Sequence, residues 1–376
     1  MWLFKSSIGR KFVMAVTGIC LVLFVTFHVL MNSVALLWPA AYNQVCEFLG
    51  ANWYALVASM GLAALFIIHI IYAVWLTLQN RKARGADRYA VTSRPPQVEW
   101  ASKNMLVLGI VILAFLGVHL VNFWAKMQLV ELCHTPAGDL PTLDGYPVGP
   151  AMGTLFIQMA FSQIWVPVVY IIGFVALWFH MTHGFWSMLH SVGWDNNNWL
   201  PRLKCIGNWW TSIVVLLFVA QAVVFTVQAH RNYYTENQAL QEQYAEYWEA
   251  QAAAANEDFE GGLNALMAPY VKQFQEAQSA NPAQAQTIYT DAMAVQANYM
   301  QENGAAYVKK AEAIANAFEG QCPKVAAPEA LRRMTQLVEQ IKPMLAAQPQ
   351  TGEADPRMPQ GARQVEEPAQ SEQPNN

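Results

Sequence analysis

Five long stretches of this chain contain no Lys, Arg, Asp or Glu. They cover residues 12–46, 48–80, 104–125, 145–194 and 205–230. Each can hold about 20 apolar residues, the length that an α-helix needs to cross the hydrocarbon core of a bilayer. The sequence therefore predicts an all-α fold with a five-helix transmembrane bundle. We expect the helices at about residues 12–36, 53–78, 103–126, 164–189 and 207–229.

The charges divide the chain into two unlike parts. Residues 1–230 contain 12 Lys and Arg against 7 Asp and Glu, whereas residues 231–376 contain 10 against 19. The second part is rich in Ala, Gln and Glu, and Asn281–Pro282 is typical of a helix N-cap followed by proline at the first helical position. We expect a membrane domain over residues 1–230 and a helical extension over residues 231–348. A disordered tail rich in Pro, Gln and Glu should follow over residues 349–376.

The basic residues indicate which ends of the helices face the cytoplasm. They precede the first helix and occupy the second and fourth connections, whereas Glu47, Glu131, Asp139 and Asp144 lie in the first and third. This distribution predicts a cytoplasmic N-terminus and, after five crossings, an extension on the outer side. Lys126 is the only cation in the first and third connections. The other basic residues are Lys5, Arg10, Lys11, Arg81, Lys82, Arg84, Arg88, Arg94, Lys103, Arg202 and Lys204.

Four histidines lie in four different predicted helices: His28, His69, His119 and His180. Each lies about 4 residues, or about 6 Å, beyond the midpoint of its helix in chain direction. Because consecutive helices cross the membrane in opposite directions, His28 and His119 share the outer layer, and His69 and His180 share the inner layer. Two histidines at each depth would supply both axial ligands of two stacked haems.

Other interpretations of these histidines are simpler. A lone histidine in a membrane helix is usually a hydrogen-bonded interior residue, and zinc or copper would need three or four donors where each layer offers two. The matched layers favour haem. The chain has no CxxC or CxxCH motif, so we expect two b haems held by ligation and packing alone. A cleaved signal peptide over residues 1–41 is not favoured, because its apolar stretch is too long and its removal would delete His28.

Further candidate residues surround the four histidines. His183 lies about one helical turn from His180 and is an alternative ligand or a contact of a haem propionate. Several glycines either let the edge of a macrocycle approach the backbone or serve close helix packing. They are Gly18, Gly61, Gly109, Gly117, Gly173 and Gly184. Two of Cys46, Cys133 and Cys322, on the predicted outer side, could pair as a disulfide, and the sequence does not say which.

Three features of the chain together point to one family. They are the opening SSIGRKFVMAVTG (residues 6–18), the four histidines and the segment HMTHGFWS (residues 180–187). Over about residues 1–230, the chain resembles the cytochrome b subunit of succinate dehydrogenase and fumarate reductase. The likeness is to the single-polypeptide, five-helix, di-haem form of that subunit.

The resemblance implies cofactors, partners and a location. His28 and His119 would bind the distal haem iron, and His69 and His180 the proximal one. Electrons would pass between menaquinone in the bilayer and an iron–sulfur subunit, which docks with a flavoprotein subunit at the cytoplasmic face, where succinate and fumarate interconvert. The implied location is a bacterial cytoplasmic membrane, and nucleic acid is not an expected partner. Some members carry a proton-conducting glutamate two residues before the last ligand, and Trp178 stands there in this chain.

Glu47 is the only acid between the first two predicted helices. Because quinone chemistry needs a proton donor or acceptor beside the ring, we take Glu47 as the candidate quinone-site acid, with a solvated loop carboxylate as the alternative. The extension is not part of the family core, and we expect it to be dispensable for electron transfer or to bind a partner. Alternative functions are the cytochrome b subunit of another dehydrogenase, such as a membrane hydrogenase, and a non-enzymatic, histidine-lined metal transporter.

Overall fold

The computed structural model describes residues 6–50, 52–84, 100–194 and 196–346, and this part of the chain is almost entirely helical. Five helices are long and apolar enough to cross a membrane, as the sequence predicts. They are α2 (Ser7–Leu37), α4 (Trp53–Arg84), α5 (Trp100–His119), α8 (Trp165–Ser191) and α9 (Trp199–His230). The predicted tail over residues 349–376 and the basic residues Lys5, Arg88 and Arg94 lie outside the described residues.

The helix α2 begins earlier than the charge pattern suggests. Ser6 caps it, because the Ser6 hydroxyl accepts a hydrogen bond from the backbone N–H of Gly9 at 2.9 Å. Arg10 therefore lies inside the helix, and its guanidinium lies 5.4 Å from the ring centroid of Trp75 in α4. The absence of charge marks the limits of the hydrocarbon region, whereas the cap determines where the helix starts.

Short elements cover one end of the bundle. They are α3 (Pro39–Gly50), the π-helix η1 (Leu120–Trp124), α6 (Gln128–Leu132), the 3-10 helix η2 (Ala137–Asp139), β1 (Thr142–Leu143), β2 (Tyr146–Pro147), α7 (Gly153–Phe161) and α10 (Tyr233–Glu236). The strands pair antiparallel through a tight turn in which Asp144 and Gly145 have φ of 52° and 88°. Within the uncharged stretch of residues 145–194, the buried helix α7 precedes the membrane helix α8.

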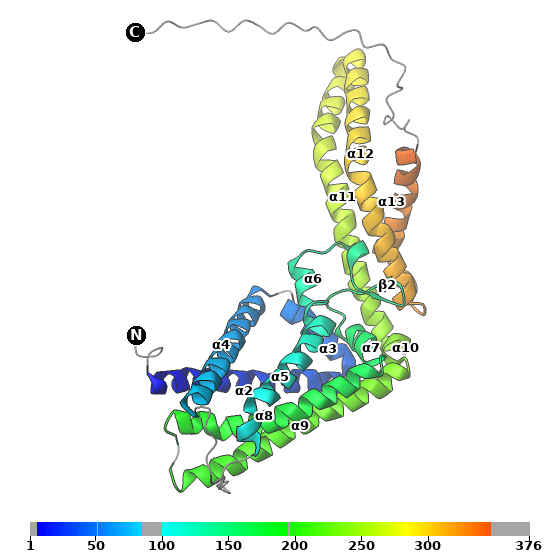
Figure 1. Cartoon of the computed structure of the whole chain (residues 1–376). Helices are drawn as coiled ribbons and strands as arrows, with labels where there is room; N and C mark the ends of the chain where they lie inside the picture. Colours follow the sequence, from blue (N-terminus) through cyan, green and yellow to red (C-terminus); the bar gives the residue numbers. More distant parts are fainter. Residues whose placement is uncertain (1–5, 51, 85–99, 195, 347–376) are drawn as a thin grey trace, which may run out of the picture.

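Three helices form the extension: α11 (Gln238–Ala280), α12 (Pro282–Gln321) and α13 (Glu329–Ala346). The helices α11 and α12 pack as a long antiparallel hairpin that rises from the end of the bundle where α3, α7 and α10 lie (Figure 1). Asn281 separates them and caps α12, because its side-chain oxygen accepts a hydrogen bond from the backbone N–H of Gln284 at 3.3 Å. The prediction of a helix start at Asn281–Pro282 is confirmed.

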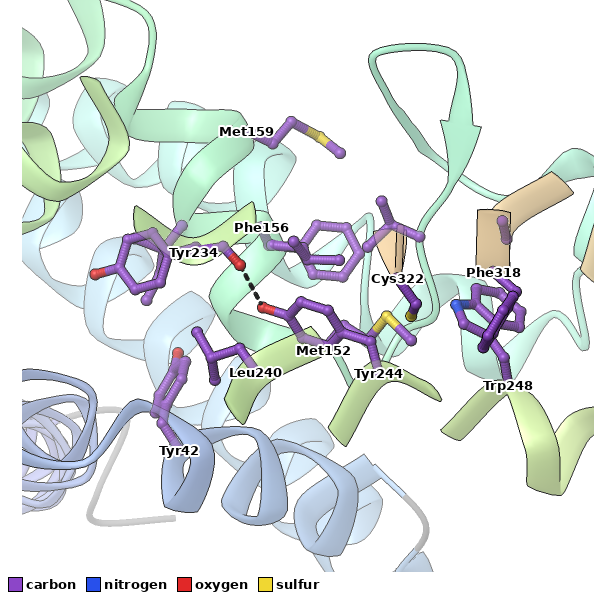
Figure 2. Packing of buried hydrophobic residues seen from close by; sticks show 14 of the residues in the cluster. Tyr42, Met152, Phe156, Met159, Tyr234, Leu240, Tyr244, Trp248, Phe318 and Cys322 are labelled. Carbon is purple, nitrogen blue, oxygen red and sulfur yellow. Dashed lines mark hydrogen bonds between the residues drawn. The ribbon is translucent and has the colours of Figure 1, made fainter. Parts of the chain in front are cut away.

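One hydrophobic core joins the bundle to the extension. It runs from Val29 in α2, through α7 and α9, to Ile341 in α13. Its largest fully buried side chains are Trp248, Tyr234 and Tyr244, which lie at the junction (Figure 2). The indole N–H of Trp248 donates to Oε1 of Gln321 at 2.9 Å. The composition changes near residue 231, but the packing is continuous across that point.

This junction predicts a large loss of stability for Trp248→Ala. The substitution opens a cavity between α11 and α12 and leaves the Gln321 oxygen without its donor, which should cost about 3–5 kcal/mol. The control Val271→Ala changes a side chain of α11 that is 50% exposed and should cost within about 0.5 kcal/mol. Thermal unfolding in detergent, followed by circular dichroism, measures both, and equal midpoints would contradict the continuous core.

Candidate functional site

The structure brings two pairs of histidines together inside the bundle. The ring centroids of His28 and His119, from α2 and α5, lie 5.7 Å apart with an interplanar angle of 88°. Those of His69 and His180, from α4 and α8, lie 6.4 Å apart at 60°. We call His28 and His119 the extension-side pair and His69 and His180 the opposite pair. These are the pairs that depth in the membrane predicts.

The spacing within each pair suits two imidazoles on opposite sides of one metal atom. Bonds of about 2 Å from a metal to one nitrogen of each ring would place the ring centroids about 6 Å apart. Both ring planes then contain the shared axis and are free to rotate about it, so both interplanar angles are compatible. The residues present therefore fit bis-histidine ligation of haem iron at both positions.

The surroundings of His69 leave one ring nitrogen available as a ligand. The hydroxyl of Thr17 in α2 donates to the carbonyls of Val13 and Met14, each at 3.0 Å. Its oxygen lies 3.1 Å from Nδ1 of His69, and since its only proton is already used, it accepts from the ring. Nδ1 therefore carries the proton, and Nε2 keeps the lone pair that a metal would take.

Its partner His180 carries a buried atom without a hydrogen bond. Nδ1 of His180 is buried and has no partner among the described residues. A buried polar atom without a partner is costly, and such atoms are uncommon in folded proteins. Nδ1 of His180 therefore needs a hydrogen-bond or ligand interaction that no described side chain supplies.

Tyr170 fixes the ring of His119 in the extension-side pair. The Tyr170 hydroxyl lies 3.3 Å from Nδ1 of His119, beside Asn122. His119 is the last residue of α5, and the chain continues as the π-helix that contains Asn122. The wider turn of this π-helix is a common feature of functional sites.

His28 is held by Asn32, one turn further along α2. The side-chain amide of Asn32 donates to the backbone oxygen of His28 at 2.8 Å, and its nitrogen lies 3.3 Å from Nε2 of the ring. The oxygen of the same amide accepts from the hydroxyl of Tyr42 at 3.1 Å. Since the Tyr42 hydroxyl donates to the amide oxygen, the amide nitrogen faces His28 and Nε2 is the unprotonated ring nitrogen. A metal at this pair would take the Nε2 lone pair in place of that bond, and Asn32 would keep its bond to the His28 backbone.

The glycines near the histidines fall into two groups. Gly173 serves close packing, because a Cβ added there would collide with Cγ of Phe115. Gly18 and Gly109 lie beside the rings of the opposite pair, where an added Cβ would lie 3.9 and 4.0 Å from Cε1 of His69 and His180. At three others an added Cβ meets no described atom within 4 Å: Gly61, Gly117 and Gly184. Close packing therefore applies at Gly173, and the approach of a macrocycle edge at the other positions stays a prediction.

The ring of His183 contacts a tryptophan of its own helix. Its ring centroid lies 5.0 Å from that of Trp186, on the same helix. Lys204 of α9 lies 4.2 Å from the Trp186 ring centroid. The geometry therefore favours His180 as the partner of His69.

Trp178 donates its indole N–H to the Ser212 hydroxyl at 3.0 Å and so ties α8 to α9.

Glu47 is exposed on α3, and its negative charge acts on the Tyr247 hydroxyl of α11. Burial raises the pKa of Tyr247, and the negative charges of Glu131 and Glu47 raise it further. Burial also raises the pKa of the half-buried Glu131 carboxyl. Two acids rather than one therefore face this region, and the sequence pattern did not distinguish Glu131 from an ordinary loop carboxylate.

The cysteines are all free in the structure, including the three candidates for a disulfide. Cys322 is buried, Cys46 is half-buried and Cys133 is exposed. Burial raises the pKa of both the Cys46 and the Cys322 thiol to about 12, so both are protonated near neutral pH. In the described part of the chain, no three His, Cys, Asp or Glu side chains gather as a metal site.

Comparison with known proteins identifies no relative: no family model, curated protein or solved structure matches the chain. Fold and site define the class as a multi-pass helical membrane protein with two half-buried histidine pairs.

The glycine contacts yield a matched pair of substitutions. Gly173→Ala should destabilise the protein by about 1–3 kcal/mol, because the new methyl group would collide with Phe115. Phe115 also packs 5.0 Å from Tyr170 by ring centroids, so the strain should reach the surroundings of His119. At Gly61 an added Cβ meets no described atom within 4 Å, so Gly61→Ala should be neutral or slightly stabilising. A thermal midpoint for Gly173→Ala that equals that of Gly61→Ala would refute the packing role.

Proposed function

We propose that this chain is the di-haem membrane subunit of a succinate:quinone oxidoreductase. The observation that carries the proposal is the presence of two imidazole pairs, 5.7 and 6.4 Å apart, on four separate membrane helices. Each pair offers two nitrogen donors, which is the number of axial ligands that haem iron takes. Zinc or copper would need three or four donors. The resemblance of residues 6–18 and 180–187 to the cytochrome b family supports the same function.

The residues of the chain have distinct tasks in this function. Bound haem supplies one-electron chemistry at each of two depths. Both imidazoles of a pair bind the iron, which leaves no position for oxygen and suits electron transfer. Thr17 and Tyr170 orient the rings of His69 and His119 through their Nδ1 atoms. The apolar helices around them exclude water, which strengthens these polar contacts.

The charges along the chain support an orientation and partners. Basic residues at the start of α2 and the end of α4 lie at the cytoplasmic face in this proposal, and the extension lies outside. An iron–sulfur subunit and a flavoprotein subunit dock at the basic face, and menaquinone reacts within the bilayer. Co-purification of these two subunits with quinone-linked succinate oxidation or fumarate reduction tests the complex. If hydrogenase subunits co-purified instead, the chain would be the cytochrome b subunit of a membrane hydrogenase.

Single histidine substitutions should remove the haems pair by pair. His69→Ala and His180→Ala should lose the same haem, and His28→Ala and His119→Ala the other, because both rings of a pair hold one iron. His183→Ala is the matched control on α8 and should keep both haems. Reduced-minus-oxidised spectra with extracted haem per chain measure the result. Loss of a haem in His183→Ala, with none in His180→Ala, would reassign the ligand.

Glu47 is the proposed acid for quinone chemistry on the extension side. Glu47→Gln should slow quinone-linked turnover several-fold, because the amide can neither accept nor deliver a proton at the ring. Both haems and dye-linked activity of the partner subunits should remain. Asp139→Asn, in the next connection on the same side, is the control. Glu131→Gln shows whether the half-buried acid serves instead, and unchanged quinone turnover in Glu47→Gln dismisses Glu47.

A further inference from the structure

The first helix of the extension is hydrogen-bonded to α3 through one side chain. The amide nitrogen of Gln243 in α11 donates to the backbone oxygen of Ala40 at 3.0 Å. Its amide oxygen accepts from the side chain of Asn43 at 2.9 Å. Because both ends of the Gln243 amide are used, α11 and α3 are held in one relative position.

Asn43 connects this contact to α7 and back to α11. It is 5% exposed, and its oxygen accepts from both the backbone N–H and the hydroxyl of Thr154, each at 2.9 Å. The hydroxyls of Thr154 and Tyr244 lie 2.7 Å apart. The Tyr244 hydroxyl also donates to the backbone oxygen of Tyr234 at 3.0 Å (Figure 2). These four residues are buried, so water cannot replace the bonds if one is removed.

Tyr42 carries the connection from α3 to the extension-side pair. It precedes Asn43 in α3 and is 8% exposed. Its hydroxyl donates to the Asn32 oxygen at 3.1 Å, and Asn32 contacts both the backbone and the ring of His28. Hydrogen bonds from Gln243 to α3, and from Tyr42 of α3 to Asn32, therefore connect the extension with the backbone of His28. The step from Asn43 to Tyr42 runs along the α3 backbone.

We propose that the extension positions His28 through α3, Tyr42 and Asn32, and thereby sets the redox potential of the haem at the extension-side pair. This inference rests on the proposed function. Residues that orient an axial ligand tune the metal it holds, because they determine ring orientation and ligand basicity. Tyr42 and Gln243 are positioning residues in this scheme. The extension is thus a part of the electron-transfer unit rather than a dispensable appendage.

The opposite pair provides an internal reference. His69 is held by Thr17 of α2, and Nδ1 of His180 has no partner among the described residues, so neither is bonded to the extension. A change in the extension contact should therefore act on one haem only. If the contact served merely to stabilise the fold, its loss would lower the unfolding temperature and leave both potentials where they were.

The test is a redox titration of both haems in the full chain, in its native complex. Tyr42→Phe removes the donor to Asn32, and Gln243→Ala removes both bonds to α3. The matched controls are Tyr299→Phe, which loses a hydroxyl bond to the backbone oxygen of Phe259 within the extension, and Gln238→Ala, on an exposed face of α11. The haem that His119→Ala removes identifies the extension-side potential.

Tyr42→Phe and Gln243→Ala should each shift the extension-side potential and leave the opposite one unchanged, while both controls leave both unchanged. Two bound haems with unmoved potentials in both variants would overturn the proposal, and so would equal shifts of both potentials. Failure of the proposed function looks different. In that case the unsubstituted chain itself binds no haem, and no potential exists to compare.

Discussion

Imidazoles within a membrane interior must be partnered, and this constraint organises the bundle. A polar ring in hydrocarbon is costly unless it is bonded, so each of the four histidines has to face the interior and meet a polar group. The pairs His28–His119 and His69–His180 thereby join α2 to α5 and α4 to α8. The helix α2 also packs against α4, α8 and α9, and α8 against α5 and α9, so the two pairs lie within one connected set of helices.

Much of this arrangement follows from the sequence because it depends on depth alone. Position along a membrane helix determines depth, and alternating direction determines which histidines share a layer. Rotation of each helix about its axis is a different matter. Lipid and helix contacts are both apolar, so a uniformly apolar helix carries no sequence pattern that shows which face points inward. Thr17, Asn32 and Tyr170 were therefore not predictable as partners of the rings, although each contacts one.

In the extension, too, local features could be predicted from the sequence, whereas long-range contacts could not. Asn281 was predictable as a cap because capping is a local interaction of a few residues. The change in composition near residue 231 marks where the chain leaves the lipid, and it does not indicate which surfaces then pack together. Tyr234, Tyr244 and Trp248 belong to one buried core with residues of α7 and of the bundle. Contacts between residues about 200 positions apart, such as Asn43 with Gln243, depend on that tertiary packing.

The central claim is that each histidine pair holds one haem, and the haem content of the purified chain tests it most directly. The account predicts two non-covalently bound haems per chain, extractable with acid and solvent, with low-spin b-type bands in the reduced-minus-oxidised spectrum. Low-spin bands are expected because both axial positions are filled by imidazole. A colourless chain, a single haem, or a high-spin spectrum with an open axial position would contradict the claim.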